Sequence, residues 1–138
     1  MAFVLDASVA LAWCFEDEST SYTHRVLKRL WREEAFVPPI WPFEVANALA
    51  SALRARRMKP ADAERFLALL ETFPLGVEPR GMTAVFKKVL PLAREQGLSC
   101  YDASYLELAL RLGLPLATLD RALQRAARRA GAALVSEL

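Results

Sequence analysis

The apolar positions of the chain fall into short runs that are separated by longer amphipathic stretches. The short runs do not alternate with polar residues, which predicts buried strands over residues 3–5, 36–38, 75–78, 114–118 and 133–135. Longer stretches with helical spacing predict helices over 7–15, 19–35, 42–53, 60–73, 83–96, 100–112 and 120–131. Because apolar strands and helices alternate, we expect an α/β fold, a three-layer α/β/α sandwich with a short-stranded parallel sheet.

Prolines and glycines mark several of the predicted helix ends. Pro42 and Pro60 each suit the first turn of a helix. Gly97 and Gly113 each follow a helical stretch in the manner of a C-cap. Since no linker, repeat or low-complexity segment interrupts the pattern, residues 1–138 are interpreted as a single domain.

The composition says little about binding partners, but it bears on where in the cell the protein is expected. The 138 residues include 18 Lys and Arg against 16 Asp and Glu, so any basic surface for a nucleic acid must be local. Cys14 and Cys100 lack the spacing of a metal site and are interpreted as reduced thiols. Every apolar run is well short of the roughly 18 residues of a membrane span. We therefore expect a soluble, cytoplasmic protein with no membrane partner.

Four acidic residues stand out because each lies in an apolar stretch. They are Asp6, Glu44, Asp102 and Asp120. One interpretation is structural, because each falls in the first turn of a predicted helix, where an acid caps free N–H groups and opposes the helix dipole.

The other interpretation is chemical. Asp6 and Asp120 directly follow apolar strands, so both should emerge at the carboxyl edge of the sheet, where such folds bind ligands. Glu44 and Asp102 open helices whose starts could face the same edge. Converging carboxylates repel one another unless a cation offsets their charge, and an all-oxygen set suits Mg²⁺ or Mn²⁺. Such an ion can assist phosphodiester hydrolysis. The only histidine, His24, lies mid-helix among basic residues, which argues against a His-based nuclease or zinc enzyme.

Four segments that occur in a fixed order carry a family resemblance. They run over residues 3–8, 42–49, 98–105 and 116–120, and each holds one of the four acids. With these segments the chain resembles the PIN domain, and specifically the VapC-type toxins of bacterial and archaeal toxin–antitoxin pairs. The similarity extends over the whole chain.

The resemblance implies a twisted parallel sheet between helical layers and a metal-dependent endoribonuclease that uses Mg²⁺ or Mn²⁺. It implies an RNA substrate (tRNA, rRNA or mRNA), a homodimer, and a cognate VapB-type antitoxin whose tail covers the acidic groove. The family's catalytic, metal-binding acids fall on Asp6, Glu44, Asp102 and Asp120, with Asp120 either a direct ligand or one that acts through water.

The family's polar supporting residues fall on Ser8, Asn47 and Thr118. Ser8 could orient Asp6, although a hydroxyl at a helix start is the simpler alternative. Asn47 lies one helical turn beyond Glu44 and could support that acid. Thr118 could bind a water or a phosphate, or could serve only in packing.

Two groups of arginines are candidates for contacts with RNA phosphates. Arg54 belongs to the basic cluster after the Glu44 helix, and Arg121 and Arg125 share a helix face that begins at Asp120. The alternative is that they offset a helix dipole or lie solvated on an outer face.

Two other functions compete with a nuclease. A non-catalytic PIN-like module that binds RNA or protein would usually have lost one or more acids, and all four are present. A haloacid-dehalogenase-like phosphatase needs a second Asp two positions after the first, where this chain has Ser8. A receiver domain needs a Lys after its last strand, where this chain ends in Ser136, Glu137 and Leu138.

Overall fold

A parallel sheet of four short strands forms the centre of the protein over residues 1–136, the part of the chain that the computed structural model describes. Its strands are β1 (Ala2–Leu5), β2 (Glu34–Val37), β3 (Leu75–Val77) and β4 (Leu116–Ala117), in the order β3-β2-β1-β4. Every neighbouring pair is parallel, as predicted. The carboxyl ends of all the strands therefore meet at one edge. Glu137 and Leu138, the end of the predicted 1–138 domain, lie outside the described residues.

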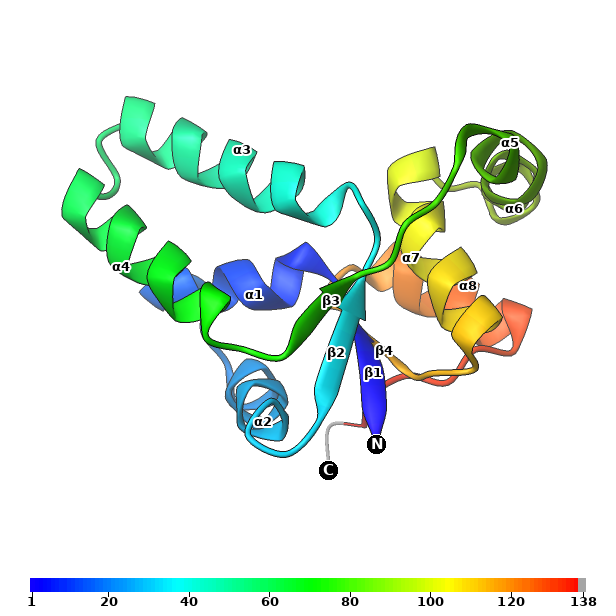
Figure 1. Ribbon diagram of the computed structural model, residues 1–138, viewed down its shortest axis with the longest axis horizontal. Helices are drawn as coiled ribbons and strands as arrows, with labels where there is room; N and C mark the ends of the chain where they lie inside the picture. The colour runs from blue at the N-terminus through cyan, green and yellow to red at the C-terminus, as the bar shows by residue number, and fades with distance from the viewer. Residues whose placement is uncertain (137–138) are drawn as a thin grey trace.

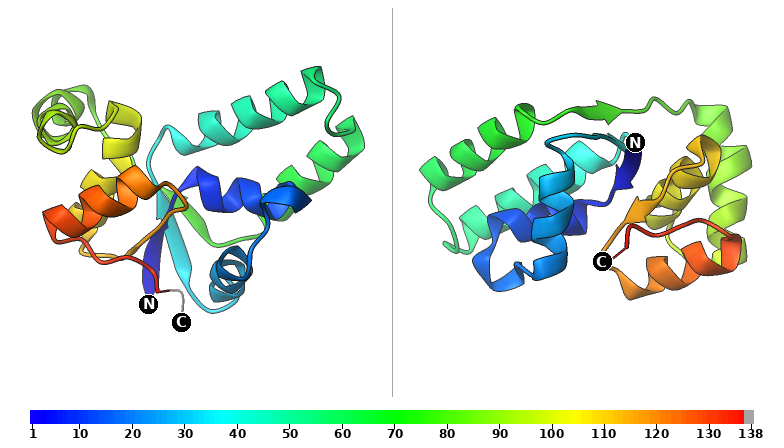
Figure 2. Two further views of the ribbon diagram at one scale, coloured as in Figure 1. Left: turned by 180° about the vertical axis from the view of Figure 1, so that it is seen from behind. Right: turned by 90° about the horizontal axis from the view of Figure 1, so that it is seen from below.

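Helices cover both faces of the sheet. The first group is α1 (Ala7–Cys14), η1 (Glu16–Glu18), α2 (Ser21–Arg29), α3 (Trp41–Arg54) and α4 (Pro60–Glu71). The second is α5 (Met82–Ala84), η2 (Val85–Val89), α6 (Leu90–Gln96), α7 (Cys100–Leu112) and α8 (Arg121–Ala130). Figures 1 and 2 show the first group on one side of the sheet and the second on the other, which gives the expected three layers. None of the helices within residues 1–136 is both long and apolar enough to cross a membrane.

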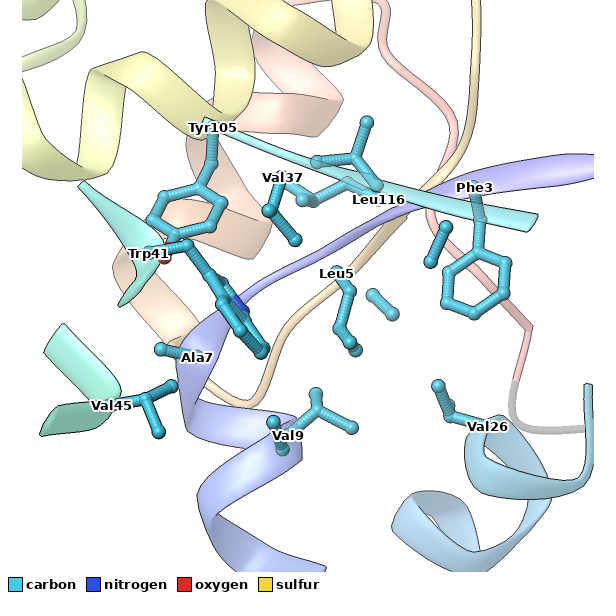
Figure 3. Close-up of a cluster of buried hydrophobic side chains, with 14 of the residues drawn as sticks. Phe3, Leu5, Ala7, Val9, Val26, Val37, Trp41, Val45, Tyr105 and Leu116 are labelled. Atoms are coloured by element: carbon cyan, nitrogen blue, oxygen red, sulfur yellow. The ribbon is translucent and has the colours of Figure 1, made fainter. Parts of the chain in front are cut away.

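The core is built around β1, whose residues Phe3, Val4 and Leu5 are fully buried. Figure 3 shows Leu5 between Val9 of α1 and the strand residues Val37 and Leu116, with Tyr105 of α7 farther away in the same cluster. Burying one large apolar side chain contributes roughly 1.5–3 kcal/mol. Since the last three residues of β1 are fully buried, the residue that follows it is held in a well-defined position at the carboxyl edge.

The region after α2 differs from the prediction. The helix predicted over 19–35 ends at Arg29, and β2 begins at Glu34 rather than at residue 36. Ala35 and Val37 alternate as buried positions of β2 and pair alongside β1 and β3, so burial in the sheet outweighs the helical pattern of the residues before it.

The last predicted strands are also shorter than expected. β4 covers only Leu116–Ala117 instead of 114–118. The strand predicted over 133–135 is a single parallel bridge between Leu116 and Leu134. Two backbone hydrogen bonds flank that bridge, from Leu116 to Ala133 and from Val135 to Leu116, so this segment extends the edge of the sheet for one residue only.

The helix predicted over 83–96 forms from Met82 to Gln96 but contains one widened turn, η2. Pro91 has no N–H, and its ring would clash with the carbonyl four residues earlier in a regular helix. A π turn just before a proline relieves that conflict. Val89 and Ala93 then pack against Ala103, which fixes this helix against α7.

Candidate active site

Asp6 directly follows β1, and its carboxylate is buried with 6% of the residue exposed. It occupies the N-cap position of α1 but its side chain makes no capping hydrogen bond. Instead, Oδ2 accepts hydrogen bonds from the hydroxyls of Ser8 (2.7 Å) and Thr118 (2.6 Å). Two predicted supporting residues therefore lie against the Asp6 carboxylate, and a helix cap alone does not account for these contacts.

Backbone groups fix the direction in which both hydroxyls donate. The Ser8 oxygen accepts the N–H of Leu119 (3.0 Å), and the Thr118 oxygen accepts the N–H of Asp120 (3.0 Å). Each hydroxyl hydrogen is thus left for Asp6. Gln124, on α8, donates from Nε2 to the Thr118 carbonyl (2.9 Å) and secures the same loop. Sequence reasoning missed Gln124, whose only signal was its place one turn into the helix after Asp120.

Asp120 serves as a helix cap in the way that the structural interpretation predicts. Its Oδ1 accepts the N–H of Leu123 (3.1 Å) at the start of α8. The residue is half-buried, and its charge still acts on Asp6 and Asp102, as described below. A capping contact and a place in the acidic cluster are therefore combined in one side chain.

Glu44 lies in the first turn of α3, and Oε1 accepts a hydrogen bond from the hydroxyl of Tyr105 on α7. Asn47, the predicted support for Glu44, is exposed on α3, and it is Tyr105 that contacts the carboxylate. Tyr105 was missed as a site residue. Its sequence signal is its spacing of three from Asp102, which places both on one side of α7.

Asp102 is half-buried in the first turn of α7. The cap of this helix is Ser99, whose hydroxyl oxygen accepts the N–H of Asp102 (3.1 Å). Ser99 therefore caps the start of α7, and its side chain also favours the ionised form of Asp102, which lowers the pKa of that carboxyl against the effect of burial.

The charges of Asp6, Asp102 and Asp120 raise the pKa values of neighbouring acids in the cluster. Burial is the main cause that raises the pKa of Asp6, and the charge of Asp120 raises it further against the lowering effect of the two hydroxyls. Burial likewise raises the pKa of Glu44, with contributions from Asp6 and Asp102. The pKa of Asp102 is raised by burial and then by Asp120 and Asp6. These charge effects indicate that Asp6, Glu44, Asp102 and Asp120 lie near one another at the carboxyl edge of the sheet.

The acidic cluster offers carboxylate oxygens, the kind of ligand that a hard divalent cation binds. Within residues 1–136, no three His, Cys, Asp or Glu side chains are grouped closely enough to hold one ion together. Mg²⁺, however, usually keeps several waters and takes one or two carboxylates, so three protein ligands are not required. Buried and half-buried carboxylates at one edge of the sheet fit the oxygen preference and the positive charge of such an ion.

The candidate RNA-binding arginines lie at different distances from the acids. Arg121 and Arg125 are exposed on α8, next to Asp120, and neither has an ion-pair partner in the described part of the chain. Arg54 ends α3 and donates to Ser51 (3.3 Å). Ten residues of helix separate it from Glu44, which is about 15 Å along the axis. Arg54 is therefore not part of the acidic cluster.

Comparison with known proteins adds an independent line of argument. A family profile described as "PIN domain" matches residues 3–129. The curated "Ribonuclease VapC3" of Pyrobaculum aerophilum is 30% identical over 123 residues, which cover 89% of this chain and 92% of that protein.

Two solved structures share the fold. PAE2754 from Pyrobaculum aerophilum has a TM-score of 0.68 at 29% identity, over 91% of this chain and 79% of that one. VapBC2 from Rickettsia felis, solved bound to a DNA fragment from its promoter, has a TM-score of 0.66 at 13% identity, over 91% of this chain and 93% of that one.

Proposed function

Since the chain belongs to the PIN-domain family, we propose that it is a metal-dependent endoribonuclease and the toxin of a toxin–antitoxin pair. The observation that carries this proposal is the cluster of Asp6, Glu44, Asp102 and Asp120 at one edge of the sheet. Asp6, Asp102 and Asp120 each raise the pKa of at least one other acid of the cluster, so the site needs positive charge to hold all four ionised.

In this proposal Asp6 and Asp102, with Glu44 and Asp120, hold Mg²⁺ or Mn²⁺. When bound, the cation would offset the carboxylate charge, bind a phosphate oxygen and make water a stronger nucleophile. Ser8 and Thr118 keep Asp6 turned into the site, and Tyr105 keeps Glu44 there. The reaction is hydrolysis, in which a water oxygen bonds to phosphorus and the bond from phosphorus to the departing ribose oxygen breaks.

RNA is the proposed substrate, as tRNA, rRNA or mRNA. Arg121 and Arg125 support this, because their exposed guanidinium groups lie on the helix that begins at Asp120 and can meet phosphates entering the site. The overall charge of +2 is small, so the attraction for RNA is local to this side of the molecule. A cytoplasmic location, where such RNA occurs, follows from the same proposal.

A VapB-type antitoxin is the proposed protein partner. VapBC2, which shares this fold, is named as such a pair, and a partner that covers the acidic edge would block RNA. A second copy of the chain is the other proposed partner. Met82, Phe86 and Leu90 recur every four residues on one helical stretch and are 72%, 60% and 44% exposed, an apolar stripe suited to a homodimer.

Cleavage of a circular RNA tests the proposed activity. A circle has no ends, so its conversion to a linear product reports internal cutting and not trimming. We expect linear product with Mg²⁺ or Mn²⁺, none with EDTA, and none from the Asp102→Asn variant. Glu64→Gln, an exposed acid on α4, is the matched control and should cut normally. Binding of RNA without any cutting would indicate a non-catalytic PIN-like module instead.

A further inference from the structure

The turn between α3 and α4 carries four cations within six residues. Arg54, Arg56, Arg57 and Lys59 are all exposed there, and together they form the basic tip of the α3–α4 hairpin. Figure 1 shows this tip far from the sheet, at the opposite end of α3 from the carboxyl edge. The tip is therefore a charged surface separate from the acidic cluster.

One of the four cations is engaged with the body of the protein. The guanidinium carbon of Arg57 lies 5.0 Å from the centre of the Phe15 ring, a cation–π contact. Its Nη2 also lies 3.9 Å from a carboxylate oxygen of Asp17. These contacts hold the tip against the segment that follows α1.

The other three cations are not neutralised. Arg54, Arg56 and Lys59 have no ion-pair partner among residues 1–136. The next acid along the chain, Asp62, is paired with Arg65 instead. Three exposed positive charges are therefore free to bind an anionic partner.

The backbone of Arg56 lies in the left-handed region that favours glycine, with φ at 56°. The other residues of positive φ in the described chain are Gly97, Gly113 and Gly131, and each of them ends a helix. Arg56 takes the same place after α3, where glycine would fit without strain. Strain that is kept at such a position points to a use for the side chain.

The first helix of the hairpin, α3, leads from the acidic cluster to the basic tip. Ser51 lies seven residues after Glu44, about two turns, so both residues are on one side of α3. Arg54 donates from Nη2 to the Ser51 hydroxyl (3.3 Å), which keeps its guanidinium near that side. Glu44 and Arg54 are separated by about 15 Å along the helix axis.

We propose that the basic tip binds phosphates of the RNA substrate at a distance from the bond that is cut. Exposed arginine and lysine side chains without acidic partners are the usual contacts to a phosphate backbone. At a rise of about 3.4 Å per nucleotide, 15 Å corresponds to about four or five nucleotides. The inference rests on the proposed ribonuclease function and deepens it, because it requires an RNA that extends well beyond the acidic cluster.

Binding of single-stranded RNA tests the tip without requiring cutting. The probe is a fluorescent 20-nucleotide oligouridylate, and the protein carries Asp102→Asn so that the RNA stays intact. We expect the triple variant Arg54→Gln, Arg56→Gln, Lys59→Gln to bind more weakly. The slope of log affinity against log salt should fall by about 2, for three lost contacts of about 0.7 each. The loss should thus grow about 100-fold as the salt falls from 1 M to 0.1 M.

An equal change of charge elsewhere is the matched control. Arg25, Lys28 and Arg32 are exposed and have no ion-pair partner in the described part of the chain. Figure 1 shows their region, α2 and the turn after it, at the opposite end of the sheet from the carboxyl edge. The triple variant with Gln at these three positions should keep the parent affinity and slope. Equal losses in the two triple variants, or no loss in the tip variant, would overturn the inference.

Arg56→Gly separates RNA binding from folding. Glycine relieves the strained backbone, so this variant should melt at a higher temperature while it binds the oligouridylate less tightly. Unchanged RNA affinity would show that the Arg56 side chain has no part in the site. A protein that fails to cut circular RNA would defeat the proposed function, while these binding measurements would still decide whether the tip holds RNA.

Discussion

The hydroxyl of Tyr105 donates a hydrogen bond to Oε1 of Glu44 and so joins α7 to α3 across the acidic cluster. Tyr105 is fully buried, which leaves its hydroxyl few alternatives to this contact. Because Asp102 lies one turn earlier on α7, the same helix supplies one acid and holds another. Two acids that are 58 positions apart in the numbering (44 and 102) are thereby fixed relative to each other.

Removing that hydroxyl should weaken cation binding without unfolding the protein. Loss of a group that orients a metal ligand typically costs 10- to 100-fold in metal affinity. We expect Tyr105→Phe to lose about that much affinity for Mn²⁺ by isothermal titration calorimetry. Tyr101→Phe, on the exposed side of the same helix, is the control. Equal Mn²⁺ affinity in the two variants would show that Tyr105 serves packing only.

Neutralising Asp6 should stabilise the metal-free protein while abolishing cleavage. Its carboxylate is buried near Asp120, so keeping it ionised destabilises the folded protein. A neutral Asn at this position would not have that effect. We expect Asp6→Asn to raise the free energy of unfolding in EDTA by about 0.5–2 kcal/mol, a usual gain when functional strain is relieved. Urea denaturation measures this. A less stable variant would mean that Asp6 is a structural anchor and not a strained site residue.

The acidic cluster should also make metal-free stability fall as the pH rises. In the folded protein the pKa values of Asp6, Glu44 and Asp102 are raised, so above their ordinary values near 4 the folded state binds more protons than the unfolded state. Stability is therefore lost as the pH rises from about 4 through the raised pKa values. Glu33, whose pKa is lowered by its hydrogen bond with Arg29, has the opposite sign, and its contribution is lost as the pH falls below about 4.

Thermal unfolding in EDTA at pH 5 and pH 7.5 measures this effect. The melting temperature should be lower at pH 7.5, and Mn²⁺ should remove most of the difference because it favours the ionised carboxylates. Asp6→Asn should reduce the difference as well. A melting temperature in EDTA that is the same at both pH values would argue that the acids do not repel one another.

Thr118 should matter for stability as well as for the site. Its buried hydroxyl both donates to Asp6 and accepts from the Asp120 backbone, so Thr118→Val leaves the buried Asp6 carboxylate and the half-buried Asp120 N–H each with one partner fewer. The expected loss is about 1–3 kcal/mol in the free energy of unfolding. Thr83→Val, at an exposed position where the hydroxyl makes no hydrogen bond with any described residue, should stay within about 0.5 kcal/mol of the parent protein. Equal losses in both variants would exclude a special role for the Thr118 hydroxyl.

Local sequence patterns predicted the position of those site residues that directly follow a parallel strand. An acid that directly follows an apolar strand must emerge at the carboxyl edge, so Asp6 and Asp120 could be placed together from the sequence. Ser8 could be linked to Asp6 because it lies only two positions later in the sequence.

Contacts made across the core could not be predicted in this way. Tyr105 reaches Glu44, and Gln124 reaches the Thr118 loop, only because of how α7 and α8 pack, which no local pattern specifies. Asn47 was expected to support Glu44 from its spacing; Asn47 is exposed and Tyr105 makes the contact with the Glu44 carboxylate, so a role for Asn47 stays a prediction. The start of β2 was mispredicted because pairing with β1 outweighed helical periodicity.

An Mn²⁺-soaked crystal, examined by anomalous diffraction, tests the central claim most directly. The account predicts a peak at the carboxyl edge of the sheet, in contact with a carboxylate oxygen of Asp6 and of at least one other acid of the cluster. No peak there, or a peak bound only to surface acids such as Asp62 and Glu64, would contradict it.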